Sequence, residues 1–491
     1  MSGDLIDRLC RLAETAPNQV LYVELLNGSD ESGRLTAGQL HDRAAAVAGS
    51  LAASGIGPGE VALHIASSPI EFLIGLFGCM WAGVIAAPIS FPRREEHLVS
   101  RLEPVRANAE AVAIVAGTPQ GKGETAVLER LTGGELPVVP IDAPAPESFP
   151  EPFRERDIAY LQYTSGSTSE PKGVIVSHAN LIANLDLCAA LIGYGPDMVN
   201  VSWCPLTHDM GLIMGALASV AFGCTSVLMP PGAFIRRPLV WLQAIDRYRG
   251  THGYSPNFGY DLCVDRSTPE EREALDLSSM RVFVNGAEPV RELTGQRFLE
   301  AFASSGLRAE AYAPAYGLAE ASVLVTATPT DSSGLVLWAD TAALERDEVV
   351  LTDPGDPGAR SICGDGVTGP EHEIAIVDPA TRTRVSPGRV GEVWLRGPSV
   401  CLGYWHRPME TEATFGAVLA GEQGPTWLRT GDLGFMHDGE LVLCGRAKDL
   451  IVVRGRNIHP QDLEFSAEQS HRAVRLGGSA AFAIRGDDGV E

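Results

Sequence analysis

YTSGSTSEPKG, residues 163–173, lies between two apolar stretches, 158–164 and 173–177, that are typical of buried strands. Serial backbone N–H groups in such a Gly/Ser/Thr loop form a concavity that binds anionic oxygens, and the hydroxyls add further donors. Lys172 supplies a mobile positive charge at the end of the loop. The stretch therefore predicts a phosphate-binding loop between two strands, and its apolar flanks argue against a flexible linker.

The loop differs from the P-loop of nucleotide triphosphatases, whose pattern is G-x-x-x-x-G-K-[ST]. Counting from Gly166, the second glycine position holds Pro171, and Gly173 replaces the Ser or Thr that would hold magnesium. The segment that follows, VIVS (174–177), is typical of a strand, whereas a P-loop opens a helix. The P-loop NTPase class is therefore excluded.

Composition narrows the class of protein further. With 491 residues, 45% of them apolar and 20% charged, the chain is expected to fold into several domains with large cores. The formal net charge of −24 disfavours binding to nucleic acid or to an anionic membrane, both of which need a basic surface. A small anionic ligand is still compatible, because a pocket can be locally positive on an acidic protein.

Cysteine usage and hydropathy indicate the compartment. The nine cysteines are scattered without a C-x-x-C pair, so we expect reduced core thiols and neither disulfides nor a zinc site. No secretory signal opens the chain, and we expect a cytoplasmic protein. The longest apolar run, 72–89, is interrupted by glycines and predicts a buried helix followed by a strand, with no membrane span.

The order of the elements predicts an α/β fold. The segments 61–67, 69–83, 84–90 and 178–192 read as strand, helix, strand and helix, an order typical of parallel sheets covered by helices. After residue 360, short alternating strands and turn residues predict a small antiparallel β subdomain. The final run, 479–491, reads as one strand that enters a turn.

Six stretches together resemble the motifs of one superfamily. They are 163–173, SWCPLTHDMGL (202–212), VNGAEPV (284–290), AYGLAEAS (315–322), LRTGDLG (428–434) and GRAKDLIVVRGRNIHPQDLE (445–464). In this order they resemble the adenylate-forming superfamily, which includes acyl-CoA synthetases, luciferase-like enzymes and peptide-synthetase adenylation domains. HDMGLI, NGAEPVR and YGLAEAS are most similar to fatty acyl-AMP ligases and acyl-CoA ligases.

This resemblance implies a domain organisation. A large multi-sheet α/β N-terminal domain would occupy residues 1–447, with a β-rich subdomain at about 360–447. A mobile C-terminal subdomain would begin at 448–491 and be incomplete there. In the fatty acyl-AMP ligase branch an additional segment, here 331–360, is expected to restrain that small domain and to discourage free coenzyme A as the acceptor.

The resemblance also implies a ligase with two half-reactions. A carboxylate attacks the α-phosphorus of ATP in the presence of Mg²⁺, pyrophosphate leaves, and an acyl-adenylate forms. A thiol of coenzyme A or of carrier-protein phosphopantetheine then takes the acyl group and releases AMP. The first step depends on neutralising the phosphate charges and on in-line placement of a weak nucleophile.

Residue roles carry over by motif position. Thr164, Ser165, Gly166, Ser167, Thr168 and Lys172 would hold the β- and γ-phosphates, and Glu320 would bind Mg²⁺. Adenine would lie against Tyr316 and Gly317, with Gly286, Ala287 and Glu288 along its edge, and the ribose against Asp432 and Arg446. His208, in a stretch read as an apolar strand, would lie between the acyl carboxylate and the thiol path, and Lys448 would be the hinge of the small domain. Each of three residues also has a structural alternative. His208 could be a core histidine, Tyr316 a core aromatic residue, and Asp432 a residue that only forms a turn.

The acyl pocket is predicted from small and apolar residues. Its expected lining is Gly211, Gly215, Asn257, Phe258, Gly259 and Ala315. The small residues leave room for a long or bulky group, so the expected substrate is a hydrophobic carboxylic acid. The choice between coenzyme A and an acyl carrier protein stays open, as does the oligomeric state.

Two departures from the family pattern bear on the first half-reaction. Ser169 stands at a loop glycine position, where a β-carbon costs about 1 kcal/mol or more if φ is positive. The lysine that the family uses for adenylation would lie beyond Glu491, as expected if this sequence is a piece of a longer protein. An alternative is therefore a second-step enzyme that thioesterifies a pre-formed acyl-AMP. A luciferase-like oxygenase and a non-catalytic nucleotide-binding protein are further alternatives, and Lys172, Glu320 and Asp432 argue against the latter.

Overall fold

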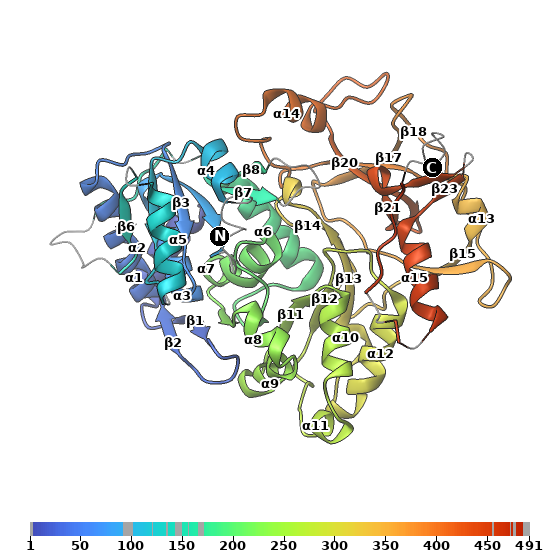
Figure 1. The fold of residues 1–491 in the computed structure, drawn as a ribbon, viewed down its shortest axis with the longest axis horizontal. Coiled ribbons are helices and arrows are strands. Elements are labelled where there is room, and N and C mark those ends of the chain that lie inside the picture. The colour runs from blue at the N-terminus through green and yellow to red at the C-terminus, as the bar shows by residue number, and fades with distance from the viewer. Residues whose placement is uncertain are drawn as a thin grey trace. The chain divides into compact units, whose positions relative to one another are not determined.

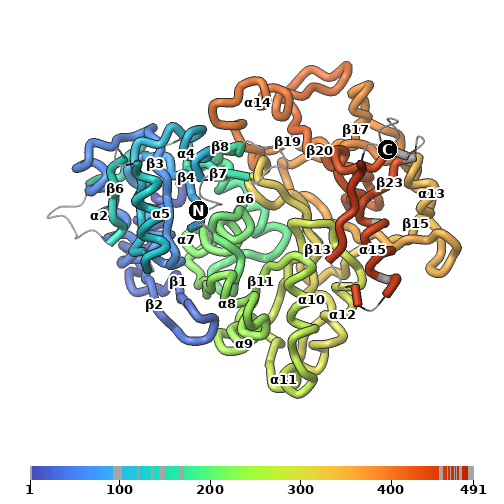
Figure 2. The backbone as a smooth tube through the Cα atoms, in the orientation of Figure 1, coloured from blue at the N-terminus to red at the C-terminus, as the bar shows by residue number. Residues whose placement is uncertain are grey.

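The computed structural model of the chain describes most of the sequence. The described residues are 3–91, 102–119, 121–133, 136–142, 150–155, 157–164, 171–453, 456–471, 473–474 and 478–484. The chain forms two compact units, whose elements are labelled in Figure 1 and whose backbone is traced in Figure 2. The first unit comprises Met1–Tyr254, Leu318–Val323 and Pro398–Glu412, and the second comprises Ser255–Gly317, Leu324–Gly397 and Ala413–Glu491.

The first unit contains a six-stranded sheet in the order β6-β5-β3-β4-β7-β8. Its strands are β3 (Val61–Ile65), β4 (Ile85–Ile89), β5 (Ala113–Ala116), β6 (Val138–Pro140), β7 (Ile158–Thr164) and β8 (Lys172–Ser177). All neighbouring strands are parallel except β7 and β8, which pair antiparallel. The predicted strand–helix–strand order is confirmed, because α3 (Pro69–Ala82) lies between β3 and β4 in the chain.

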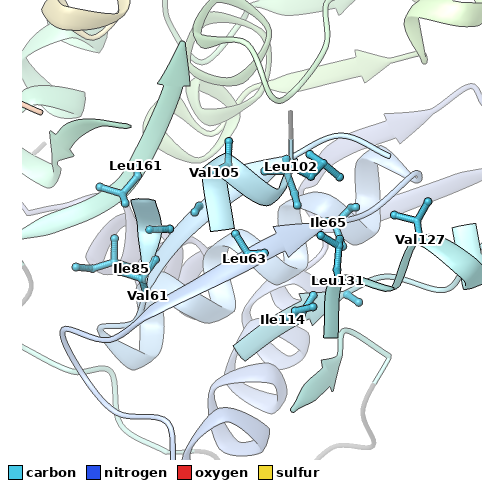
Figure 3. Close-up of a cluster of buried hydrophobic side chains, with 14 residues drawn as sticks. Val61, Leu63, Ile65, Ile85, Leu102, Val105, Ile114, Val127, Leu131 and Leu161 are labelled. Carbon is cyan, nitrogen blue, oxygen red and sulfur yellow. The ribbon is translucent and has the colours of Figure 1, made fainter. Parts of the chain in front are cut away.

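The two faces of this sheet are covered by different helices. Val61, Leu63 and Ile65 of β3 alternate along the strand and join a buried cluster with apolar residues of α4 (Glu103–Ala109) and α5 (Lys122–Thr132) (Figure 3). His64 points to the opposite face, where its ring centroid lies 4.4 Å from that of Phe72 in α3. The α/β class is thus built as the sequence predicts, with helices on both faces of a mainly parallel sheet.

The first unit also contains the strand order β11-β9-β10-β1-β2, which is parallel except for β2. These strands are β1 (Val20–Glu24), β2 (Gly33–Thr36), β9 (Val199–Ser202), β10 (Thr225–Leu228) and β11 (His252–Ser255). The further helices up to β11 are α1 (Leu5–Thr15), α2 (Ala37–Ala53), α6 (His178–Ile192), the π-helix η2 (Met210–Leu217), α7 (Ala218–Phe222), α8 (Pro231–Arg236) and α9 (Leu239–Tyr248). Helix α6 has the bounds that the sequence predicts.

The second unit combines an α/β portion with antiparallel sheets. Its α/β portion has β12 (Val282–Asn285) parallel to β13 (Tyr312–Gly317), β14 (Leu324–Ala327), and helices α10 (Asn257–Asp265), α11 (Pro269–Glu273) and α12 (Glu292–Phe302). A two-stranded sheet pairs β15 (Val336–Asp340) with β16 (Ala359–Cys363) around α13 (Thr341–Leu344). A five-stranded sheet has the order β18-β17-β19-β20-β21, and its neighbouring strands pair antiparallel, as predicted for the strands after residue 360. Those strands are β17 (Glu373–Asp378), β18 (Thr383–Arg384), β19 (Gly391–Arg396), β20 (Leu428–His437) and β21 (Glu440–Arg446).

The last described part of the chain corrects one prediction. After the short helix η6 (Ala447–Asp449), β22 (Ile451–Val453) and β23 (Arg456–Ile458) form a hairpin, and α15 (Pro460–Ser470) follows. The strand predicted from residue 479 is wrong over 479–484, which carry no strand, while residues 485–491 of that prediction lie outside the described residues. The backbone N–H groups of Ser479 and Ala481 donate to the carboxylates of Glu468 and Glu464 in α15, at 3.4 and 3.0 Å. Side chains of a helix therefore satisfy donors that a neighbouring strand would otherwise satisfy.

The thiol and membrane predictions can be compared directly. Eight of the nine cysteines, all except Cys10, are buried, which confirms the prediction of core thiols. Among the described residues, no helix has both the length and the apolar character needed to cross a membrane.

The imidazole of His64 is buried in the first sheet. His64 is fully buried, and neither ring nitrogen has a hydrogen-bond partner among the described residues. Burial lowers its pKa to about 3, because a charged imidazolium would lose its hydration without compensation. Between pH about 6.5 and about 3 the imidazole of His64 is therefore neutral in the folded protein, whereas it is protonated in the unfolded chain.

We expect His64→Leu to reduce the loss of stability in mild acid. Below the unfolded pKa of about 6.5 the unfolded state binds a proton that the folded state rejects, so stability falls as pH drops from about 6.5 towards about 3. Between pH 7.5 and 5.5 this contributes about 1.4 kcal/mol, which the variant should not lose. Urea unfolding at both pH values measures it, with His406→Gln as control at a side chain that is 48% exposed. Identical pH dependence in His64→Leu and the unsubstituted protein would contradict the assignment.

Candidate functional site

The flanks of the predicted phosphate loop are fixed by strand pairing in the first unit. Thr164 and Lys172 are opposite each other at the end of the β7–β8 ladder, and Tyr163 is opposite Gly173. The Tyr163 ring covers Gly173, where an added Cβ would lie 3.0 Å from its Cζ, and its hydroxyl donates to Asn108 Oδ1 at 2.8 Å. The predicted loop residues Ser165, Gly166, Ser167 and Thr168, and the departure at Ser169, lie outside the described residues.

An extended segment of the first unit, residues 401–405, adds to the other edge of β8. Ile175 N donates to Gly403 O at 2.9 Å, and Trp405 N donates to Gly173 O at 2.8 Å. At the start of this segment Cys401 N donates to Glu320 O at 2.9 Å, which ties Glu320 to the same edge. The predicted phosphate ligand Lys172 and the predicted metal ligand Glu320 are thus held by one backbone framework.

A tyrosine that sequence reasoning missed contacts both of these residues. The Tyr404 hydroxyl donates to Glu320 Oε1 at 2.7 Å, and Lys172 Nζ lies 4.9 Å from the centroid of the Tyr404 ring. Tyr404 is separated from Glu320 by 84 residues in the chain, so no local pattern could have revealed the contact. The result is a Lys–Tyr–Glu constellation in which a neutral side chain contacts each charged group.

The chemistry of this donor set fits a hard divalent cation bound together with phosphate. Glu320 is half-buried and offers carboxylate oxygens, which Mg²⁺ prefers. Among the described residues there is no group of three or more His, Cys, Asp or Glu side chains that could hold a metal alone. A cation at Glu320 would therefore need further oxygen ligands, and phosphate oxygens near Lys172 are of the right kind.

His208 lies in a turn between β9 and η2, so its placement in an apolar strand is wrong. Its Nδ1 is 2.7 Å from Asp209 Oδ1, and its side chain is 52% exposed. The Asp209 carboxylate raises the pKa of His208. The preceding residue, Thr207, accepts a hydrogen bond at its carbonyl from Gln162 Nε2 of β7 at 2.9 Å, and its hydroxyl lies 2.7 Å from Ser90 Oγ. The turn that carries His208 is thus anchored to the strand that leads into the predicted loop.

Two of the predicted pocket glycines have a packing reason in the structure. A Cβ on Gly211 would lie 2.2 Å from the Pro205 carbonyl oxygen, and one on Gly215 would lie 3.1 Å from Ser202 Oγ. Both residues belong to η2, and π-helices recur at functional sites. Close approach of backbone to backbone explains Gly211 without any ligand.

In the second unit the predicted ribose and adenine residues come together. Asp432 of β20 is opposite Arg446 of β21, and Arg446 Nε lies 3.0 Å from Asp432 Oδ1. The hydroxyl of Tyr316 in β13 donates to the other oxygen, Oδ2, at 2.6 Å. Burial raises the pKa of Asp432, while Arg446 and the Tyr316 hydroxyl act in the opposite direction. The carboxylate is buried, yet each of its oxygens receives a donor.

The predicted adenine loop follows β12. A Cβ on Gly286 would lie 2.7 Å from the carbonyl oxygen of Ala315 in β13, and Ala287 has a left-handed φ of 67°. Ala287 and Glu288 are exposed, and Gly317 ends β13. The loop is therefore close-packed at its first residue and open to solvent at the next two.

Asn257, a predicted substrate residue, organises this same loop. Its Nδ2 donates to Pro289 O at 2.9 Å, and its Oδ1 accepts from Asn285 Nδ2 at 2.8 Å and from Arg291 N at 3.0 Å. Phe258 and Gly259 follow it in α10, and Phe258 is 38% exposed. The hydrogen bonds give Asn257 a structural function that spacing in the sequence did not indicate.

The chain around the predicted hinge contacts the additional segment 331–360. Lys448 is exposed in η6. Beyond it, Asn457 N donates to Glu345 O at 3.1 Å, and Asn457 Nδ2 donates to the Asp347 carboxylate at 3.2 and 3.3 Å. Residues of the additional segment thus hold β23 by three hydrogen bonds.

Comparison with known proteins decides the family. The model of the AMP-binding enzyme family matches residues 10–405. The chain belongs to the AMP-binding enzyme family. Its fold, its ability to bind ATP or AMP and its class as an acyl-AMP ligase follow from this match and from the similarities described next.

Several of the similar proteins are ligases of fatty acids. The medium-chain-fatty-acid–[acyl-carrier-protein] ligase JamA of Moorena producens is 38% identical over 98% of this chain and 83% of that protein. The long-chain-fatty-acid–AMP ligase FadD32 of Mycolicibacterium smegmatis is 36% identical over 87% of this chain and 71% of that protein. A solved fatty acyl-adenylate ligase of Legionella pneumophila, in complex with acyl adenylate and pyrophosphate, aligns with a TM-score of 0.83 at 36% identity, over 98% of this chain and 84% of that one.

We expect Gly211→Ala to destabilise the protein and Gly215→Ala to have little effect. At Gly211 the new methyl meets a backbone carbonyl that cannot rotate away, and overpacking of this kind costs about 1–3 kcal/mol. At Gly215 it meets the end of a serine side chain that can adjust. Urea unfolding measures both. Unchanged stability of Gly211→Ala, combined with an altered acyl chain-length preference, would instead assign this glycine to the acyl pocket.

We expect Asp365→Asn to become increasingly stabilising as pH rises. Burial raises the pKa of Asp365 to about 7, and the charges of Glu440 and Asp432 add to the effect. Above the unfolded pKa of about 3.8 the unfolded chain ionises first, so stability is lost as pH rises from about 4 to about 7. Between pH 5 and pH 8 the variant should gain about 3 kcal/mol relative to the unsubstituted protein, measured by urea unfolding. A pH-independent difference would contradict this assignment.

Proposed function

We propose that this protein activates a fatty carboxylic acid as its acyl-adenylate and passes the acyl group to a thiol. The observation that carries the proposal is the buried Asp432 carboxylate, which receives the Tyr316 hydroxyl on one oxygen and Arg446 on the other. A carboxylate can accept about four hydrogen bonds, so capacity is left for two ribose hydroxyls. The names of the similar ligases support a medium- or long-chain fatty acid as the substrate.

The first half-reaction needs charge neutralisation at three phosphates. A carboxylate oxygen of the fatty acid forms a bond to the α-phosphorus, and the bond from that phosphorus to the bridging oxygen breaks, so that pyrophosphate leaves with the electron pair. Lys172, Thr164 and Ser165–Thr168 are proposed to hold the β- and γ-phosphates, and Glu320 to hold Mg²⁺. Bound Mg²⁺ would supply further neutralisation of phosphate charge.

The nucleoside would be held in the second unit. Tyr316 and Gly317 are proposed to contact adenine, with Gly286, Ala287 and Glu288 at its edge, while Asp432 and Arg446 bind the ribose. In the second half-reaction the thiol gives its proton to solvent or to a base, its sulfur bonds to the acyl carbon, and the bond from that carbon to the phosphate oxygen breaks, so that AMP leaves with the electron pair. His208 is proposed to lie near this thiol path, with Lys448 as the hinge between a domain of residues 1–447 and the segment that follows. The name of JamA supports carrier-protein phosphopantetheine as the acceptor, with coenzyme A as the competing thiol.

One sequence feature favours a second candidate function. Ser169 replaces a glycine in the loop that would grip the β- and γ-phosphates, and an acyl-adenylate has neither phosphate. An enzyme that receives acyl-AMP ready-made would tolerate this replacement while it keeps Asp432 and Arg446. Only the first half-reaction separates the two candidates.

For protein made from the full reading frame, we expect ATP–pyrophosphate exchange that depends on a fatty acid of medium or long chain, and we expect Asp432→Asn to reduce it about 100-fold. The reason is the loss of a charged acceptor for ribose, since hydrogen bonds to charged groups contribute about 1.5–3 kcal/mol each. Asp438→Asn is the matched control, because Asp438 lies at the turn of the same β20–β21 hairpin and its side chain is 89% exposed. Thioester formation from synthetic acyl-adenylate with phosphopantetheine is measured in parallel. Brisk thioester formation without exchange would replace the proposed function with the second-step alternative.

A further inference from the structure

Tyr404 has a position that the backbone fixes from two sides. It forms a bridge with Val174 of β8, and Leu402 N donates to Ile175 O at 3.1 Å in the same pairing. Tyr404 N also donates to Thr411 Oγ1 at 2.9 Å. The ring is buried, with 7% of its surface exposed. Its hydroxyl and its face are therefore presented to Glu320 and Lys172 by a rigid framework and not by a mobile loop.

The two charged residues meet the tyrosine and not each other. Lys172 has no ion-pair partner among the described residues, and its ammonium lies over the Tyr404 ring. A cation–π contact attracts an ammonium without neutralising its charge. Glu320 likewise has no ion-pair partner in the described part of the chain, and its Oε1 accepts a hydrogen bond from a neutral hydroxyl. A direct Lys–Glu pair would cancel both charges before any ligand arrived.

We propose that Tyr404 is a positioning residue for the polyphosphate end of ATP. It holds Lys172 over its ring for phosphate and orients Glu320 through its hydroxyl for a divalent cation, and it keeps these opposite charges from pairing. This inference rests on the proposed function, in which the two residues contact the phosphates and the metal. Because AMP lacks the β- and γ-phosphates, the effect of Tyr404 is confined to ATP and absent for AMP.

Two substitutions separate the hydroxyl from the ring. Tyr404→Phe keeps the aromatic face under Lys172 and removes only the hydrogen bond to Glu320. Tyr404→Leu removes both contacts. Tyr248→Phe is the matched control. The Tyr248 hydroxyl also donates to a carboxylate, Glu31 Oε2 at 3.2 Å, and neither residue belongs to the proposed phosphate, metal, adenine or ribose sites.

The experiment is calorimetric titration of each protein with Mn²⁺·ATP and, separately, with AMP. We expect Tyr404→Phe to weaken Mn²⁺·ATP about 3- to 10-fold, the range for one lost hydrogen bond, and to leave AMP binding unchanged. Tyr404→Leu should weaken Mn²⁺·ATP further, and Tyr248→Phe should match the unsubstituted protein for both ligands. In the exchange assay Tyr404→Phe should raise KM for the metal–ATP complex more than it lowers kcat.

The outcomes distinguish this inference from the proposed function. Equal weakening of ATP and AMP by Tyr404→Phe would indicate a merely structural role and overturn the inference, as would unchanged Mn²⁺·ATP affinity. If Tyr404→Leu fails to fold, Tyr404→Phe still decides the question. Binding of Mn²⁺·ATP by the unsubstituted protein without any exchange would refute the proposed adenylation, while the titration of the Tyr404 variants would still test the inference.

Discussion

The Lys–Tyr–Glu constellation of the first unit, Lys172, Tyr404 and Glu320, depends on the hydrogen bonding of β8 along both of its edges. One edge pairs antiparallel with β7, which sets Thr164 opposite Lys172 at the ends of the two strands that flank the predicted phosphate loop. The other edge pairs with residues 401–405, whose first member also binds the backbone of Glu320. Because both edges are occupied, β8 has no register to slip into, and a one-residue slip would turn Lys172 to the opposite face. Backbone pairing of β8 therefore fixes the positions from which the side chains of Lys172, Tyr404 and Glu320 extend.

Buried polar groups at the proposed site and away from it differ in how far hydrogen bonds offset their burial. Asp432 is buried but receives donors on both oxygens, so its desolvation is offset. His64 has no hydrogen-bond partner among the described residues, and burial favours its neutral imidazole in the folded protein. Asp365 accepts a hydrogen bond from Leu443 N at 3.1 Å and is otherwise penalised by burial and by neighbouring acids. His64 and Asp365 therefore have opposite effects on the pH dependence of stability. His64 lowers the free energy of unfolding as pH falls, and Asp365 lowers it as pH rises.

Local signals in the sequence were sufficient for most elements and insufficient for side-chain contacts. Helix α6 was predicted in full because Ser177 and Asn180 form a capping box at its start and Gly193 ends it in a left-handed conformation. The predicted final strand is wrong over 479–484, where the backbone N–H groups of Ser479 and Ala481 donate to glutamates of α15. Tyr404 was missed because its contacts are with residues distant in the chain. Family motifs named Asp432, Tyr316 and Arg446, and the structure adds that one hydrogen-bonded group contains all three.

A tyrosine hydroxyl donates to a carboxylate in each constellation, and the treatment of the nearby cation differs. In the second unit Arg446 pairs directly with Asp432, while in the first unit Lys172 lies on the ring of Tyr404 and, within the residues that the structure describes, forms no ion pair with Glu320. A carboxylate that accepts neutral ribose hydroxyls loses little by pairing with arginine, because it has lone pairs to spare. A carboxylate that binds a divalent cation would lose most of its attraction if a lysine had already neutralised it. The contrast between the two tyrosines follows from the charge of the ligand that each carboxylate is proposed to meet.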